Sequence, residues 1–404
     1  MNLIKSLPLF LFAILINTAA IGQSNTASSE TESEEALKEI IIKLNNVIKK
    51  DTTNAKAYYD RAIAKAKMFF YDEALLDYNR AAKINNNIES LHFNRGILKS
   101  LMDDHKGAIA DFNVLIAKNP NDTHAYYLRA YDKAEINDTK GSIEDYDKAI
   151  TLDSTNADFY FGKGNVYDQM ENYREAIQLY NKAIELNKSD EDYFYNRALA
   201  KFNLMDYESA IADFSEAMKI DPKYPEAYLN RGTAYSELGK FTEAIRDFDE
   251  AIKINPLDTN ALVNRGSIKL KQADYKGAEK DFTIAIETNP YIEHVYAYRA
   301  YARDMQENYD GAIADYAIVL KGNKTDSISL FNMGWDHYNI GKQKEALGYF
   351  NYFIKLYPDN PSAYYFRGHL QILLNQKPKG CEDLKTALKM GDKDATELIK
   401  EHCK

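Results

Sequence analysis

The sequence is poor in the residues and motifs on which catalysis and metal binding depend. It holds 7 His and 2 Cys among 404 residues, and because the His are scattered they indicate no metal-binding cluster. It contains no phosphate-binding glycine loop, no Gly-x-Ser-x-Gly turn and no His-Glu-x-x-His helix. Paired acids such as Asp103-Asp104 are expected at helix ends, where carboxylates cap exposed amides. We therefore expect no enzyme activity, no cofactor and no metal.

Positive charge and long apolar runs are also scarce. The 51 Lys and Arg are outnumbered by 61 Asp and Glu, which gives a net charge of −10 and disfavours binding to the phosphates of nucleic acids. After the N-terminus, no segment is long and apolar enough to cross a bilayer. The expected partner is a protein or a peptide, without nucleic acid and without membrane insertion of the mature chain.

The N-terminus has the features of an export signal. Lys5 precedes an apolar stretch from Leu7 to Ile16, and Ala20 and Gly22 supply small residues at cleavage spacing. The stretch is too short for a membrane anchor, which needs roughly 20 apolar residues. We expect residues 1–22 to be a signal peptide and the protein to be exported to the periplasm or the extracellular space. Residues 23–35 are polar and acidic and are expected to form a disordered leader.

A fixed period of 34 residues organises most of the chain. One series of positions holds only Gly or Ala: Ala62, Gly96, Ala130, Gly164, Ala198, Gly232, Gly266, Ala300, Gly334 and Gly368. A second small series follows twelve residues later, starting at Ala74, and a bulky series starts at Tyr78. Small residues at both positions indicate that two helices cross closely, with the bulky side chain filling the space beside the crossing.

Local patterning supplies the two helices of each unit. In residues 226–238, apolar or small side chains recur at near-helical spacing, and residues 243–254 repeat the pattern after the turn at Gly239-Lys240. A Pro near the end of several units, such as Pro222 and Pro256, stops one helix and starts the next. Each unit is therefore expected to be an antiparallel helix pair.

The small, small, bulky and Pro positions in a 34-residue unit resemble the tetratricopeptide repeat. The resemblance implies an all-α, right-handed superhelical solenoid of antiparallel helix pairs, with ten units over residues 55–394. Residues 36–54 are then an N-terminal capping helix or half repeat, and residues 395–404 are a C-terminal capping helix. This sequence departs from the family where Tyr and Arg replace the usual early Trp and Leu, as at Tyr228 and Arg231.

An Arg and an Asp recur sixteen residues apart, one on each helix of a unit. The pairs are Arg61 and Asp77, Arg95 and Asp111, Arg129 and Asp145, Arg197 and Asp213, Arg231 and Asp247, Arg265 and Asp281, Arg299 and Asp315, and Arg367 and Asp383. Two units have Lys163 or Met333 in place of the Arg, and these also lack the Asp. This joint loss predicts a salt bridge across each helix pair. The alternative is a basic stripe that grips anionic ligands, but the matched carboxylates would neutralise it.

Cys381 and Cys403 are the only cysteines, and they lie on the last two predicted helices. In an exported protein an even number of cysteines favours a disulfide, which would stabilise the terminal unit. Two buried free thiols are the alternative. Zinc is disfavoured because His402 is the only imidazole near the two cysteines.

The resemblance also implies where a ligand binds, because first helices line the concave face of tetratricopeptide arrays. The position before the Arg series then faces this groove, and Asn occupies it in five units: Asn94, Asn196, Asn230, Asn264 and Asn332. An Asn amide offers both a donor and an acceptor and matches a peptide bond, so the row could hold an extended backbone. The alternative is that these Asn side chains are merely solvated.

Aromatic residues give the same face a second character. The family geometry places Trp335 and Tyr338 near the groove, with Tyr301 before them. Such residues anchor interfaces, although packing between adjacent first helices is an alternative for each of the tyrosines. The residue type at the Trp335 position varies among units, so we expect Trp335 to be exposed.

These features together predict a non-catalytic scaffold of the cell envelope or secreted space that binds an extended protein segment in its concave groove. The alternative is an envelope-assembly subunit that docks a large folded partner on its convex face.

Overall fold

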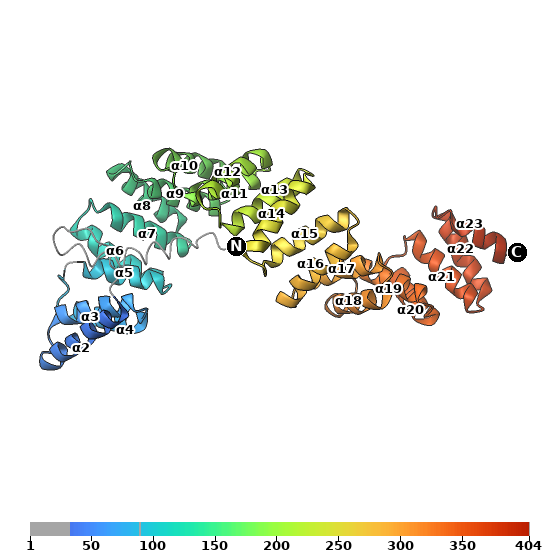
Figure 1. Ribbon diagram of the computed structural model, residues 1–404, viewed down its shortest axis with the longest axis horizontal. Helices are drawn as coiled ribbons and strands as arrows, with labels where there is room; N and C mark the ends of the chain where they lie inside the picture. The colour runs from blue at the N-terminus through green and yellow to red at the C-terminus, as the bar shows by residue number, and fades with distance from the viewer. Residues whose placement is uncertain (1–32, 89, 404) are drawn as a thin grey trace. The chain divides into compact units, whose positions relative to one another are not determined.

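The computed structural model describes residues 33–88 and 90–403, and within these residues every regular element is an α-helix. The helices group into two compact units, which divide between Asp221 and Pro222 (Figure 1). The predicted signal peptide and most of the predicted leader lie outside the described residues. No helix of the described residues has the length and apolar character that a membrane span needs.

Unit 1 contains one leading helix and five helix pairs. Its helices are α2 (Glu34–Lys50), α3 (Ala55–Lys67), α4 (Tyr71–Ile84), α5 (Leu91–Leu101), α6 (His105–Lys118), α7 (Thr123–Glu135), α8 (Thr139–Leu152), α9 (Ala157–Gln169), α10 (Tyr173–Leu186), α11 (Glu191–Asn203) and α12 (Tyr207–Ile220). Helix α2 begins at Glu34, two residues before the expected start of the capping segment.

Unit 2 contains five further pairs and one closing helix. Its helices are α13 (Pro225–Glu237), α14 (Phe241–Ile254), α15 (Thr259–Lys271), α16 (Tyr275–Thr288), α17 (Glu293–Asp304), α18 (Tyr309–Gly322), α19 (Ser327–Asn339), α20 (Gln343–Leu356), α21 (Pro361–Leu373), α22 (Lys377–Lys389) and α23 (Ala395–His402). The consecutive pairing confirms the all-α solenoid class in each unit.

The small and bulky series of the sequence meet inside each pair. A Cβ atom added to Gly266 would lie 2.7 Å from the ring of Phe282, and one added to Gly232 would lie 2.8 Å from the ring of Phe248. Both rings are fully buried. The series is therefore small because the aromatic ring of the second helix occupies the place of a side chain on the first, as predicted.

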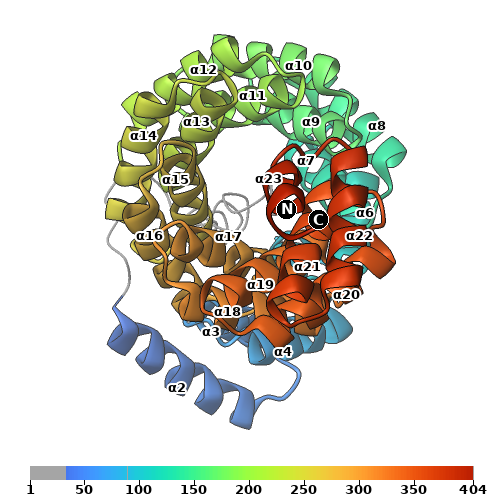
Figure 2. The ribbon, with the colours of Figure 1, turned by 90° about the vertical axis from the view of Figure 1, so that its right-hand side faces the viewer.

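The first helices of successive pairs pack against one another within each unit. Helix α9 contacts α7 and α11, and α15 contacts α13 and α17. Figure 2 shows α9 and α11 of unit 1 on the inner side of the curve and α10 and α12 on its outer side, and it shows α15 inside α14 and α16 in unit 2. First helices thus line the concave face of each unit.

Each Arg of the recurring series bonds the Asp of its own pair through two nitrogens. Arg231 donates from Nε and Nη2 to the two oxygens of Asp247, both at 2.7 Å, and Arg265 binds Asp281 in the same way. Arg61 and Arg95 also bond Asp77 and Asp111. All four carboxylates are buried. The structure thus places these residues in salt bridges, and a basic stripe that is free to bind anions is not formed.

The third guanidinium nitrogen reaches the preceding pair, which the sequence reasoning missed. Nη1 of Arg95 donates to Asn79 at 3.1 Å, and Nη1 of Arg129 donates to Asn113 at 2.6 Å. Arg61 makes the same contact with Asn45 of α2, so this leading helix occupies the place of a second helix. Because one side chain joins three helices, the Arg series links successive repeats as well as the two helices of each repeat.

A Lys one turn after the Arg completes many of these sites. Lys99 donates to Asp111 at 2.8 Å, beside Arg95 and His92. Burial alone would raise the pKa of Asp111, but the hydrogen bonds from these three side chains outweigh it and hold the pKa below its ordinary value. The spacing of four residues between Arg and Lys is visible in the sequence and could have predicted this second cation.

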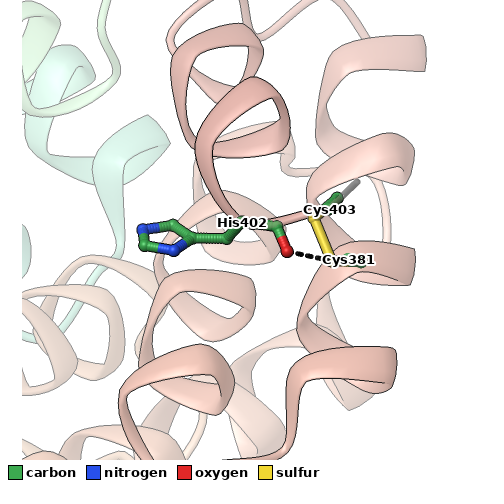
Figure 3. Close-up of a disulfide and its surroundings, with 3 residues drawn as sticks. All are labelled: Cys381, His402 and Cys403. Atoms are coloured by element: carbon green, nitrogen blue, oxygen red, sulfur yellow. Dashed lines mark hydrogen bonds between the residues drawn. A yellow bond between two sulfur atoms is a disulfide. The ribbon is translucent and has the colours of Figure 1, made fainter.

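A disulfide closes the C-terminal end of unit 2. Cys381 of α22 is bonded to Cys403, which follows α23, and their Cα atoms lie 5.6 Å apart (Figure 3). Helix α23 also packs Leu398 and Ile399 against the apolar cluster around Leu384. The disulfide therefore fixes a helix of only eight residues over the exposed end of the last pair.

Candidate functional site on the concave face

A hollow of about 330 Å³ lies on the concave face of unit 2, across the first helices α13, α15 and α17. Its volume is within the range of small-molecule and peptide-side-chain pockets. The lining residues are Leu229, Asn230, Thr233, Thr259, Asn260, Val263, Asn264, Ile292, His294 and Val295. Two of the five Asn residues predicted from the sequence, Asn230 and Asn264, therefore lie in one hollow.

The hollow exists because small side chains replace aromatic ones at one repeat position. Two residues before the recurring Arg, unit 1 has an aromatic side chain in every pair, such as Tyr127 and Phe161. Those rings pack against the next first helix, and the ring centroids of Phe161 and Tyr193 lie 4.8 Å apart. Leu229 and Val263 occupy the same repeat position in unit 2, and because they lack a ring they leave the space that forms the hollow. The loss of the aromatic side chain at this position is visible in the sequence and could have predicted the hollow.

The lining is polar but bears no Lys, Arg, Asp or Glu. This is unusual for a chain in which 28% of the residues are charged. Asn264 donates weakly to the Thr233 hydroxyl, at 3.4 Å, and it is only half-buried. Leu229, Val263 and Ile292 provide apolar surface between the amides and hydroxyls. The hollow thus offers neutral donors and acceptors beside apolar side chains, which suits an uncharged stretch of polypeptide.

Three of the predicted Asn residues are used inside the fold. Asn94 is 1% exposed and donates to the Tyr59 hydroxyl at 2.9 Å, and Asn196 is 5% exposed and donates to the Asp192 carbonyl at 2.8 Å. Asn332 donates to the Tyr316 hydroxyl at 2.8 Å. The prediction that Asn94 and Asn196 face a ligand is wrong, because packing against the neighbouring helices buries their amides.

The predicted aromatic group on α19 is a packed cluster rather than an exposed anchor. Trp335 is half-buried, stacks on Tyr338 and meets the edge of Phe366 at a centroid distance of 4.9 Å. The Tyr338 hydroxyl bonds His369 on α21 at 2.8 Å. The expectation that Trp335 is exposed is therefore corrected, because Tyr338 of the same helix and Phe366 of the next pair cover its ring. Tyr301 remains 42% exposed and contacts Tyr275 edge-on.

Potential metal ligands do not gather in the part of the chain that the structure describes. Within residues 33–88 and 90–403, no group of three or more His, Cys, Asp or Glu is placed to hold a metal ion.

Three models of tetratricopeptide repeats match parts of the chain. The model described as tetratricopeptide repeat matches residues 157–190 and 225–257, and a second model of that description matches residues 329–360. The model described as TPR repeat matches residues 131–171 and 206–239. No curated protein sequence matches the chain.

Several solved structures are similar to the chain. YrrB, a TPR protein with an unusual peptide-binding site, is 25% identical, with 48% of this chain and 97% of YrrB covered and a TM-score of 0.41. A tetratricopeptide repeat protein from Parabacteroides merdae is 20% identical, with coverage of 69% and 96% and a TM-score of 0.44. Yeast Tom70 is 16% identical, with coverage of 92% and 90% and a TM-score of 0.41. Likeness at this level carries no argument about function.

Proposed function

Because the chain is a tetratricopeptide repeat protein, we propose that it is a non-catalytic scaffold that binds an extended segment of another protein on the concave face of unit 2. The observation that carries the proposal is the hollow on α13, α15 and α17, whose lining contains no Lys, Arg, Asp or Glu. Asn230 and Asn264 belong to adjacent repeats, so their amides are placed to meet successive parts of one extended backbone.

The side chains that line the hollow limit the kinds of polypeptide segment that it can bind. Since its lining contains no Lys, Arg, Asp or Glu, the bound stretch gains little from charged side chains of its own. Its apolar lining instead favours small aliphatic side chains between backbone hydrogen bonds. We therefore propose an uncharged, extended stretch as the bound segment.

A photo-crosslinking experiment separates the concave face from the convex one. A photoreactive amino acid replaces Asn260 at the hollow in one variant and the exposed Lys280 of the outer helix α16 in the other. Both full-length variants are illuminated in extracts of the native source. We expect a partner segment to be crosslinked from position 260 and not from position 280. Crosslinks from position 280 alone would instead support docking of a folded partner on the convex face.

We also propose that the protein is exported. The proposal rests on Lys5, the apolar stretch from Leu7 to Ile16 and the small residues before Gln23. The disulfide between Cys381 and Cys403 supports it, because disulfides persist mainly in oxidising compartments. A reporter fused to residues 1–30 is expected to leave the cytosol and to be cut near Gln23. An unprocessed reporter that stays in the cytosol would contradict export.

A further inference from the structure

Two carboxyl groups of unit 2 lie together without a compensating cation. Asp336 of α19 is fully buried, and neither of its side-chain oxygens has a hydrogen-bond donor in the structure. Its side chain interacts with that of Asp304, the last residue of α17. Two ionised carboxylates are acceptors only, so they can bond each other only when one of them carries a proton.

The internal repeats show that this pair is unusual. At the position of Asp336, eight of the ten repeats have an apolar residue, such as Ala302 in the preceding repeat. The other polar residue at this position is Asp132, which belongs to unit 1. Asp132 is also fully buried, but it accepts from the Ser100 hydroxyl at 2.7 Å and lies 2.8 Å from Nδ1 of His105.

The two residues that bond Asp132 are replaced by residues of other types around Asp336. Asp304 stands at the repeat position of Ser100, and Tyr309 stands at that of His105. The donor that serves Asp132 is thus replaced by a second acid, and the imidazole that can carry positive charge is replaced by a phenol. A proton is the remaining means of joining Asp304 to Asp336.

The groups that face the pair do not supply a positive charge. Two phenols of α18, Tyr309 and Tyr316, lie close enough to interact electrostatically with both Asp304 and Asp336. Tyr301 of α17 lies near Tyr316, and Glu307 of the intervening turn lies near Tyr309. Burial raises the pKa of Asp304, and hydrogen bonding with Asp336 and with the Trp335 indole opposes this rise. Four cations or imidazoles of the surrounding elements bond other groups. Arg303 bonds Glu279 and Asp315, and His337 bonds the Met333 carbonyl. Lys342 pairs with Asp310, and His369 bonds Tyr338.

We propose that Asp304 and Asp336 share one proton that joins α17 to α19, and that loss of this proton at alkaline pH loosens the contact, so that the pair is a pH-sensitive switch within unit 2. The state with the proton is hydrogen-bonded and carries one buried charge. The state without it places a second negative charge on the fully buried Asp336, beside that of the half-buried Asp304, which favours separation of the two helices.

The direction of the pH effect follows from the difference between the pKa of Asp336 in the folded chain and its pKa in the unfolded chain. Burial, together with the charge and hydrogen bond of Asp304, raises the pKa of Asp336 to about 8 from an ordinary value of 3.8. Between about pH 4 and pH 8 the folded chain therefore keeps a proton that the unfolded chain has released. The stabilising contribution is present below this window and is lost as the pH rises through it. For one proton, the unfolding equilibrium constant rises about tenfold per pH unit.

Unfolding of the full chain between pH 5 and pH 9 tests the proposal. In Asp336→Asn the amide can donate to Asp304 at every pH, so we expect the unfolding midpoint of the unsubstituted protein to fall relative to this variant as the pH rises to about 8. Asp310→Asn removes an exposed carboxyl of α18 and is expected to follow the unsubstituted protein. Parallel pH profiles for the unsubstituted protein and Asp336→Asn would overturn the proposal.

Hydrogen exchange locates the effect. After correction for intrinsic exchange rates, amides of α17 and α19 are expected to lose protection between pH 6 and pH 9 in the unsubstituted protein but not in Asp336→Asn, with α13 and α14 as the internal reference. If the Asn variant does not fold, Asp336→Ala, which copies Ala302, takes its place. Protection at pH 9 that is restored by added Ca²⁺ or Mg²⁺ would overturn the shared proton in favour of a cation site.

Discussion

Arg231→Met is expected to lower the free energy of unfolding of unit 2 by about 3–5 kcal/mol. Asp247 is 1% exposed, and two nitrogens of Arg231 bond its two oxygens at 2.7 Å. Methionine fills a similar volume but donates no hydrogen bond, so the substitution leaves a buried carboxylate without its cation. Urea unfolding monitored by circular dichroism measures the loss. Arg246→Met, which changes an exposed Arg of the same unit, is expected to have little effect.

Adding Asp247→Leu to Arg231→Met is expected to recover much of the lost stability. The chain itself provides the precedent, because the repeat that has Met333 in place of the Arg has Tyr349 in place of the Asp, and both pack in one apolar cluster. A recovery appears as a coupling free energy between the two sites. If the loss in the double variant equals the sum of the two single losses, the two side chains do not act as a pair and the assignment of the salt bridge is wrong.

The regular part of the fold could be predicted because each repeat solves the same packing problem. The small series starting at Ala62 and the bulky series starting at Tyr78 specify a close crossing beside a buried ring, and one prediction of this contact applies to every repeat. The Arg and Asp residues could be paired for a related reason. They are lost together in the repeats of Lys163 and Met333, and the buried carboxylates explain why one does not persist without the other.

The groove was harder to predict because it depends on contacts between neighbouring repeats. Asn94 and Asn264 occupy the same repeat position, yet Asn94 is buried and Asn264 lines the hollow. The difference arises 35 residues earlier, where Tyr59 supplies a hydroxyl to Asn94 and Leu229 supplies none to Asn264. The shared repeat position of the five Asn residues does not reveal this difference, because it depends on a residue of the preceding repeat.

Trp335 shows the same limit of single-position reasoning. Variation at its repeat position predicts exposure, but the residues that cover its ring, Tyr338 and Phe366, come from other positions. Truncation of Trp335 is therefore not a clean test of binding, because it also removes packing that supports α19 and α21. The two Asn residues of the hollow provide a better test, since their amides lie at its surface.

The measurement that tests the concave site most directly is the affinity of Asn230→Ala/Asn264→Ala for the partner segment mapped by crosslinking. Each amide is expected to bond the backbone of the segment, so removing both costs about 1–3 kcal/mol, or roughly a ten- to hundredfold increase in Kd. Gln272→Ala removes an exposed amide from the turn after α15 and provides the matched control.

Isothermal titration is expected to detect this loss of affinity in the folded double variant, while Gln272→Ala is expected to bind like the unsubstituted protein. Equal thermal unfolding of the three proteins ensures that affinity and not folding is compared. An unchanged Kd in Asn230→Ala/Asn264→Ala would contradict binding in the hollow of α13, α15 and α17.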